Sequence, residues 1–376
     1  MKFVVSSTDL LAHLQAISRV MSSKNTLPIL DNFLFQLNGS DLKITASDLE
    51  TTLTTEMQLE NASDDGNIAV PAKILVDTLK EFPEQPLTFD INDDTLAIVI
   101  SSGNGQFTVV GQNGSEFPQV PQIKDDKKSS LQVSAELLEN GISKSLFATA
   151  DDELRPVMNG ILVELSTENL TFVASDAHKL VRYKRTDAKA DVNESFILPK
   201  KPAAVLKNIL PKVKGDISIE FDDKNVSIAL PNYSMVCRLV EGNYPSYNTV
   251  IPQDNPNKLT IDRIELLNTL KRVSVFSNQA SNLIKLEIKG NQLTVSAQDL
   301  DFSISAYERL NCQYDGEDME IGFKSVFLIE ILSNINSPDV IVELSDPSRA
   351  GLLLPAEKEI DEEDVLMLLM PMMINA

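Results

Sequence analysis

The chain repeats itself three times, and this repetition limits its possible folds more than any other feature. LKITASDLETTLTTEM (42–57), LTFVASDAHKLVRYKR (170–185) and LTVSAQDLDFSISAYE (293–308) each read as an alternating strand, a turn containing Asp, and a second alternating strand. A second set reads as a strand end followed by an amphipathic helix: AVPAKILVDTLKEF (69–82), ILPKKPAAVLKNIL (197–210) and IGFKSVFLIEILSNI (321–335). Aligned on Ala46, Ala174 and Ala297 in the first set and on Val70, Leu198 and Ile321 in the second, both sets are offset by 128 and then 123 residues, which indicates three copies of one domain.

A third set of segments predicts the helix that opens each copy. STDLLAHLQAIS (7–18), SAELLENGISKS (134–145) and TIDRIELLNTLKRV (260–273) each begin near a Ser or Thr suited to cap a helix. Polar linkers follow the first two copies, so we predict domains at residues 1–125, 126–255 and 256–376. Alternating strands with tight turns favour antiparallel sheets. The predicted fold class is α+β, with three repeated domains that each pack two helices on antiparallel sheets.

Composition excludes fewer functions than it first suggests. A formal charge of −22 argues against nucleic-acid binding, but net charge does not tell where the charges lie. The N-terminus lacks the apolar core of a signal peptide, and no apolar stretch approaches the roughly 18 residues of a membrane span. Cys237 and Cys312 are isolated, as is usual in a reducing compartment. We therefore expect a cytoplasmic protein with no membrane association.

Sequence motifs for catalysis or metal binding are sparse. The phosphate-binding, dinucleotide-binding and zinc-protease patterns are missing, and two His and two Cys form no obvious cluster, so we expect no metal and no cofactor. Ser175, Asp176 and His178 are the best candidates for a hydrolase site. Asp176, however, has counterparts at Asp48 and Asp299, which favours a turn-forming role in which it accepts backbone N–H bonds. His178 has no such counterparts, so it is the residue that can serve a role particular to the second copy.

Several segments together closely resemble the bacterial sliding clamp, the beta subunit of DNA polymerase III. They are TLPILDNFLFQL (26–37), VPAK (70–73), FVASDAHKL (172–180), EGNYPSY (241–247), MEIGFKSVFLIEIL (319–332) and LLMPM (368–372). The resemblance covers essentially the whole chain. It implies a non-enzymatic processivity factor, a head-to-tail homodimer whose six domains form a ring around duplex DNA. The ring slides without sequence preference and tethers the replicative polymerase, the clamp loader and repair proteins. Six domains about 35 Å across would leave a hole of similar width, enough for a duplex.

The resemblance also implies three sets of site residues. The DNA-facing set is basic and lies mostly on the second helix of each copy: Lys24, Lys73, Lys80, Arg155, Lys200, Lys201, Lys207, Lys271, Arg272 and Lys324. The pocket for partner peptides lies between the second and third domains: Met158, Ser175, Ala177, His178, Lys179, Leu180, Pro245, Val250, Ser281, Phe327, Leu368, Leu369, Met370, Pro371 and Met372. The dimer interface brings Phe107 and Val109 of the first domain to Val275 and Phe276 of the third.

The chain departs from the family pattern at several of these positions. Ala177-His178-Lys179-Leu180 stands where the family commonly has Gly-His-Arg-Leu, and the ending MPMMINA is longer and uncharged. SSGNGQF (101–107) contains no Arg, so we expect a dimer interface based on apolar packing and edge-strand pairing. The acidic run EKEIDEED (357–364) is interpreted as a solvated loop. Two alternatives stay open: a hydrolase using Ser175 and His178, and a scaffold that binds peptides without DNA.

Overall fold

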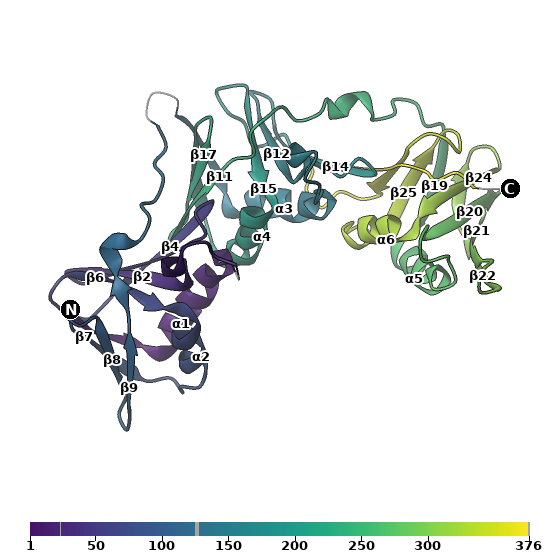
Figure 1. Ribbon diagram of the computed structural model, residues 1–376. Coiled ribbons are helices and arrows are strands. Elements are labelled where there is room, and N and C mark those ends of the chain that lie inside the picture. The colour runs from purple at the N-terminus through teal and green to yellow at the C-terminus, as the bar shows by residue number, and fades with distance from the viewer. Residues whose placement is uncertain (23, 125–127, 375–376) are drawn as a thin grey trace. The chain divides into compact units, whose positions relative to one another are not determined.

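The computed structural model describes residues 1–22, 24–124 and 128–374. The chain divides into two compact units, one made of Met1–Glu139 and Lys201–Leu239 and the other of Asn140–Lys200 and Val240–Ala376 (Figure 1). The division passes through the second repeat. Each unit therefore joins half of that repeat to a neighbouring repeat.

Each repeat contributes two α-helices, as the sequence predicts. Counted over the described residues they are α1 (Ser7–Ile17), α2 (Ala72–Lys80), α3 (Ala135–Ser145), α4 (Lys200–Ile209), α5 (Arg263–Ser274) and α6 (Ser325–Ser333). The cap of α5 differs from expectation. Thr260 lies in a strand, and the Asp262 carboxylate accepts the Glu265 N–H at 2.6 Å. Aspartate serves this role as well as Thr does, and it starts the helix three residues later.

Over its described residues, the first unit contains two antiparallel sheets. One has the strand order β5 (Asn61–Ser63), β1 (Lys2–Ser6), β7 (Pro86–Ile91), β8 (Ala97–Ser101) and β9 (Gln106–Val110). The other has the order β10 (Gln112–Asn113), β6 (Gly66–Pro71), β2 (Asn32–Asn38), β3 (Asp41–Ser47), β4 (Thr51–Gln58), β18 (Tyr233–Arg238), β17 (Asn225–Ala229), β16 (Asp216–Phe221) and β11 (Ser129–Ser134).

The second unit also contains two antiparallel sheets. One has the order β15 (Glu194–Pro199), β12 (Gly160–Leu165), β13 (Leu170–Ser175), β14 (Lys179–Arg185), β27 (Glu363–Leu369), β26 (Gly351–Pro355), β25 (Asp339–Leu344), β19 (Asn257–Asp262) and β23 (Gln313–Asp315). The other has the order β22 (Ile304–Asn311), β21 (Gln292–Asp299), β20 (Leu283–Lys289) and β24 (Met319–Lys324).

Successive repeats are fused by one recurring strand pair. β4 and β14 are the third strands after the first helix of their repeats, and β18 and β27 are the third strands after the second helix. β4 of the first repeat pairs with β18 of the second, with Thr51 opposite Cys237. β14 of the second repeat pairs with β27 of the third, with Lys179 opposite Leu369. The equivalent strands that remain, β22 and β9, each lie at the edge of a sheet.

Apolar side chains between helices and sheets form the core of each unit. In the first unit, Phe3 stacks on Phe89 with ring centroids 4.9 Å apart, and both are buried. Leu10, Leu14 and Ile17 of α1 are also buried, at the spacing of one helix face. Burial of each such side chain contributes roughly 1.5–3 kcal/mol, which holds the helices on the sheets. No helix in the described ranges is long and apolar enough to cross a membrane.

Candidate functional site

The recurring aspartate accepts backbone N–H groups in a turn of each repeat, although the turn after Asp299 is two residues longer than the other two. The Oδ1 atom of Asp176 accepts the N–H groups of His178 and Lys179, both at 2.9 Å. Asp48 and Asp299 accept the N–H groups of the residues two and three positions after them in the same way. The predicted turn-forming role is therefore confirmed.

Ser175 belongs to this turn and is not arranged as a nucleophile. Its buried Oγ donates to the Lys179 carbonyl at 2.9 Å and accepts the Ala177 N–H at 3.1 Å. The His178 ring stacks instead on Phe327, with centroids 5.6 Å apart and an interplanar angle of 21°. A triad requires the imidazole to contact the hydroxyl, so this arrangement does not serve hydrolysis.

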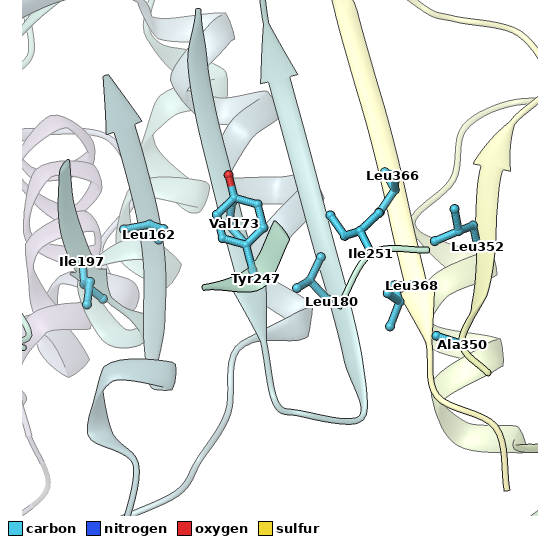
Figure 2. Close-up of a cluster of buried hydrophobic side chains, with 10 residues drawn as sticks. All are labelled: Leu162, Val173, Leu180, Ile197, Tyr247, Ile251, Ala350, Leu352, Leu366 and Leu368. Carbon is cyan, nitrogen blue, oxygen red and sulfur yellow. The ribbon is translucent and has the colours of Figure 1, made fainter. Parts of the chain in front are cut away.

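Leu180 and Leu368 lie opposite each other where β14 pairs with β27. Both belong to a buried apolar cluster that extends across the junction of the second and third repeats (Figure 2). The segment after β18 covers this cluster with Tyr247, from the 3₁₀ turn Tyr247–Thr249, and with Ile251. The Tyr247 hydroxyl donates to Glu164 at 2.5 Å. Burial raises the pKa of Tyr247 above its ordinary value, so this donor keeps its proton.

The C-terminal segment forms the rim beside this cluster. Met370 N–H donates to the His178 carbonyl at 2.9 Å, and Met372 N–H donates to Gly322 at 2.8 Å. Gly322 has no room for a side chain, because a Cβ there would lie 2.7 Å from the Met372 carbonyl oxygen. β27 ends at Leu369, two residues before Pro371, and the hydrogen bond of Met372 keeps the segment after the proline attached to β24. Met370, two residues after Leu368, and Val250, one residue before Ile251, are exposed beside members of the buried cluster, which makes an apolar surface suited to binding.

Two predicted pocket residues direct their side chains elsewhere. Lys179 is buried, and its Nζ lies 2.8 Å from Asp176, 3.0 Å from Glu330 and 4.4 Å from the centroid of the Phe327 ring. Because successive side chains of a strand alternate, Lys179 lies on the opposite face of the sheet from Leu180. Leu369, which is paired with Lys179, lies on that opposite face as well.

Three other predicted pocket residues contribute mainly to local structure. Met158 is buried at the end of the 3₁₀ turn Pro156–Met158, and its carbonyl accepts the Ala150 N–H at 2.9 Å. Ser281 Oγ accepts the Leu283 N–H at 3.3 Å. Pro245 is exposed, and its carbonyl accepts the Tyr247 N–H at 2.7 Å. Sequence reasoning missed Ile251, Leu352 and Leu366, whose only signal is apolar character, and it did not assign Tyr247 of the EGNYPSY segment to the site.

The predicted DNA-facing residues are exposed apart from Lys200 and Lys324, which are half-buried. Lys24, Lys73, Lys207 and Lys271 extend into solvent, and Lys324 Nζ lies 4.9 Å from the centroid of the Phe327 ring. The remaining five form ion pairs with carboxylates: Lys80, Arg155, Lys200, Lys201 and Arg272.

The predicted dimer residues lie beside the two unpaired edges. Phe107 is exposed on β9 and meets Phe82 edge-on, with centroids 5.2 Å apart. The two rings line a cavity of about 1050 Å³ together with Ile74. In the third repeat, Val275 and Phe276 are exposed after α5.

The turn before β22 adds two exposed side chains that the sequence prediction omitted. Leu300 is 81% exposed and Phe302 is 74% exposed. Ile304, the first residue of β22, is exposed as well. Several large apolar side chains exposed within five residues of one another form a patch of the kind that often marks an interaction site.

Models of the three domains of the DNA polymerase III beta subunit match the chain in order. The N-terminal domain model matches residues 1–121, the central domain model 132–246 and the C-terminal domain model 248–373. The chain belongs to the bacterial sliding clamps. Among the described residues of this clamp, no group of three or more His, Cys, Asp or Glu could hold a metal ion.

Individual relatives agree with this assignment. The clamp is 29% identical to the beta sliding clamp of Pseudomonas aeruginosa over 374 residues, which cover 99% of this chain and 100% of the relative. It is 26% identical to that of Vibrio cholerae, with 99% of both chains covered. A crystal structure of the DnaN sliding clamp from Pseudomonas aeruginosa bound to griselimycin superposes with a TM-score of 0.93 and 26% identity over 100% of both chains. A Thermotoga maritima beta subunit gives a TM-score of 0.90 and 27% identity, also over 100% of both chains.

The family is a non-enzymatic processivity factor of DNA replication, which removes the hydrolase alternative. The predicted family and the α+β fold of three repeated clamp domains are confirmed.

Proposed function

We propose that two copies of this clamp join head-to-tail into a ring of six domains around duplex DNA. The division at residues 1–125, 126–255 and 256–376 gives each copy three equivalent domains. The recurring strand pair is the observation that supports this most. β4 and β14 each pair with the third strand after the second helix of the next domain. Among the described residues, β22 of the third domain and β9 of the first are left at sheet edges, so we expect β22 of one copy to pair with β9 of a second copy.

The strand numbers fit this closure. Counted over the described residues, β22 is the edge of a four-stranded sheet and β9 the edge of a five-stranded sheet. Their pairing would produce nine strands, the number found at both junctions inside the chain. A head-to-tail contact that closes after two copies gives a ring with no free edge at either seam. Both edges would otherwise present exposed apolar side chains and unpaired backbone groups, a risk for aggregation.

Apolar packing is proposed to hold the seam. Phe302 and Ile304 from one copy would meet Phe107 and Val109 of the other, with Val275 and Phe276 beside them. Sedimentation at micromolar concentration should give a dimer that resists high salt. Phe302→Asp should dissociate it, because a carboxylate would be buried without a partner. Leu154→Asp alters a similarly exposed apolar residue away from the seam and should leave the dimer intact. A monomeric wild-type clamp, or a dimeric Phe302→Asp variant, would contradict the seam.

The apolar surface around Leu180 and Leu368 is proposed to bind peptides of the replicative polymerase, the clamp loader and repair proteins. The buried leucines offer apolar contact, and the flexible side chain of Met370 can adapt to different partners. His178, held on Phe327, would form one edge of the site. Lys179 and Leu369 would support the site from the other face of the sheet.

Peptide binding can be tested without disturbing the core. Val250→Glu and Met370→Glu place charges on the exposed apolar rim, so they should sharply weaken binding of a labelled peptide that carries Leu and Phe anchors. Val192→Glu makes the same change at another exposed valine and serves as the matched control. Equal peptide affinity in all three variants would exclude this surface.

A further inference from the structure

Half of the proposed DNA-facing cations are held by carboxylates of the same chain. Arg272 makes two contacts with Glu308, at 2.6 and 2.7 Å. The others among the described residues are Lys80 paired with Asp77 at 3.1 Å, Arg155 with Asp152 at 2.8 Å, Lys200 with Asp151 at 2.5 Å, and Lys201 with Asp48. A surface built for tight phosphate binding would leave such cations free.

Two of these carboxylates are fixed in place by the backbone. Asp48 uses Oδ1 to accept the N–H groups of its turn, and Oδ2 to contact Lys201. Asp152 uses Oδ1 to accept the Leu154 N–H at 2.8 Å, and Oδ2 to contact Arg155. The hydrogen bond from Arg155 holds the pKa of Asp152 below its ordinary value, so this carboxylate stays charged at neutral pH. The backbone therefore fixes the position of the carboxylate in each of these two pairs, whatever the position of the cation.

A polar cavity of about 340 Å³ in the second unit shows how these carboxylates affect the local charge. Two proposed DNA-facing cations, Arg155 and Lys200, line it. The charged side chains around it are three cations and four carboxylates: Arg155, Lys179, Lys200, Asp151, Asp152, Asp176 and Glu330. The local balance is therefore slightly negative at a place expected to face a polyanion.

We propose that Asp48, Asp151 and Asp152 act as built-in counterions that weaken the contact of this clamp with DNA phosphates. This inference rests on the proposed ring. A phosphate that approaches Lys200, Lys201 or Arg155 meets a cation whose charge a carboxylate already balances, so full neutralisation by the phosphate requires that carboxylate to move away. Each such exchange releases fewer salt ions than binding to a free cation does. The ring would then keep DNA by its closed shape while the phosphates slide past.

The consequence can be measured as salt dependence. Each cation freed to neutralise a phosphate steepens the plot of log affinity against log salt by roughly 0.9. Three freed cations would add about 2.7 to the slope, so the affinity would fall about fortyfold more than that of the wild type between roughly 50 and 200 mM salt. Asparagine is the suitable replacement because its Oδ1 can still accept the turn N–H groups.

The test compares the wild type with three variants on a short, fluorescently labelled linear duplex. The variant Asp48→Asn/Asp151→Asn/Asp152→Asn should bind more tightly at low salt and with a steeper slope. The control Glu287→Gln/Glu320→Gln/Glu343→Gln removes three carboxylates that pair with lysines on strands, so the change in net charge is the same. Adding Lys200→Gln and Lys201→Gln to the asparagine variant should bring its slope back toward that of the wild type.

The outcomes separate this inference from the ring itself. A steeper slope in the asparagine variant alone supports built-in counterions. An unchanged slope, or an equal increase in the control, overturns them. Retention of loaded wild-type clamp on closed circular DNA in high salt is measured in parallel. Failure of that retention refutes the ring, whereas retention with an unchanged slope refutes only the counterions.

Discussion

Lys144 allows the sharpest stability test of the junction between the second and third repeats. Its side chain, on α3, is only 10% exposed. Nζ lies 2.5 Å from Glu359 and 3.3 Å from Glu363, and 5.5 Å from the centroid of the Tyr183 ring. Glu363 begins β27 and is 2% exposed, so the predicted solvated loop at 357–364 extends only over residues 357–362. These contacts therefore tie α3 to the start of β27, at the end of the β14–β27 pair opposite to Leu180 and Leu368.

Lys144→Met keeps an unbranched side chain of similar length but removes the charge. It leaves the Glu363 carboxylate buried without a cation, which typically costs about 3–5 kcal/mol. With a urea slope of about 2 kcal/mol/M, the unfolding midpoint should fall by roughly 1.5–2.5 M. The matched control is Lys258→Met, which breaks a 2.8 Å contact with Glu343. Lys258 is 56% exposed, so its loss should cost about 1 kcal/mol or less.

Tyrosine fluorescence mainly reports unfolding of the second unit, which contains Lys144. The chain has no Trp, and of its six Tyr only Tyr233 lies outside Asn140–Lys200 and Val240–Ala376. The cost of Lys144→Met should be smaller near pH 5 than near pH 8, because a buried carboxylate without a cation takes up a proton more readily. Equal costs for the two lysine variants, or a cost independent of pH, would refute the reasoning.

The wild type itself should lose stability at still lower pH. Lys144 lowers the pKa of Glu359 from its ordinary value. A carboxyl with a lowered folded pKa stabilises the protein fully above its unfolded pKa of about 4.3, and that stabilisation is lost as the pH falls through the folded value. The difference in unfolding free energy between the wild type and Lys144→Met should therefore shrink as the pH falls, for two reasons. The variant is stabilised when its buried carboxylate takes up a proton, and at lower pH the wild type loses the stabilisation from Glu359.

Two further predictions concern single residues. Ala177 has a left-handed backbone with a φ of 73°, which is strained for a residue with a Cβ. Ala177→Gly should therefore stabilise the protein by up to about 1 kcal/mol and raise its melting temperature slightly. A lower melting temperature would contradict the strain. Burial raises the pKa of the Cys237 thiol above its ordinary value, so Cys237 should resist a thiol reagent until the clamp unfolds. Cys312 is only partly buried and should react first; mass spectrometry showing equal labelling in the native protein would refute this.

The repeated features were predictable because they are local. Asp48, Asp176 and Asp299 each form their turn with residues two and three positions later, so the pattern is visible along the chain. The two helices of each repeat have apolar spacing that is equally local. Comparing the copies also separated the recurring Asp176 from the unique His178.

Features that depend on distant partners were not predictable in the same way. Asp48 and Lys201 are 153 positions apart, and nothing near either residue indicates the pair. The direction of the Lys179 side chain follows from the register of β14, which a shift of one residue would reverse. The same limit applies to Tyr247, which joins a cluster drawn from several strands.

Topological retention on DNA tests the central proposal most directly. The clamp is loaded onto closed circular DNA by a bacterial clamp loader and washed in about 1 M salt, where the screening length is only about 3 Å. The ring predicts that the clamp stays on the closed circle and leaves once a nuclease linearises it. Release by salt alone, or equal retention before and after cutting, would contradict encirclement. If peptide binding persisted in that case, the protein would be a scaffold that works without DNA.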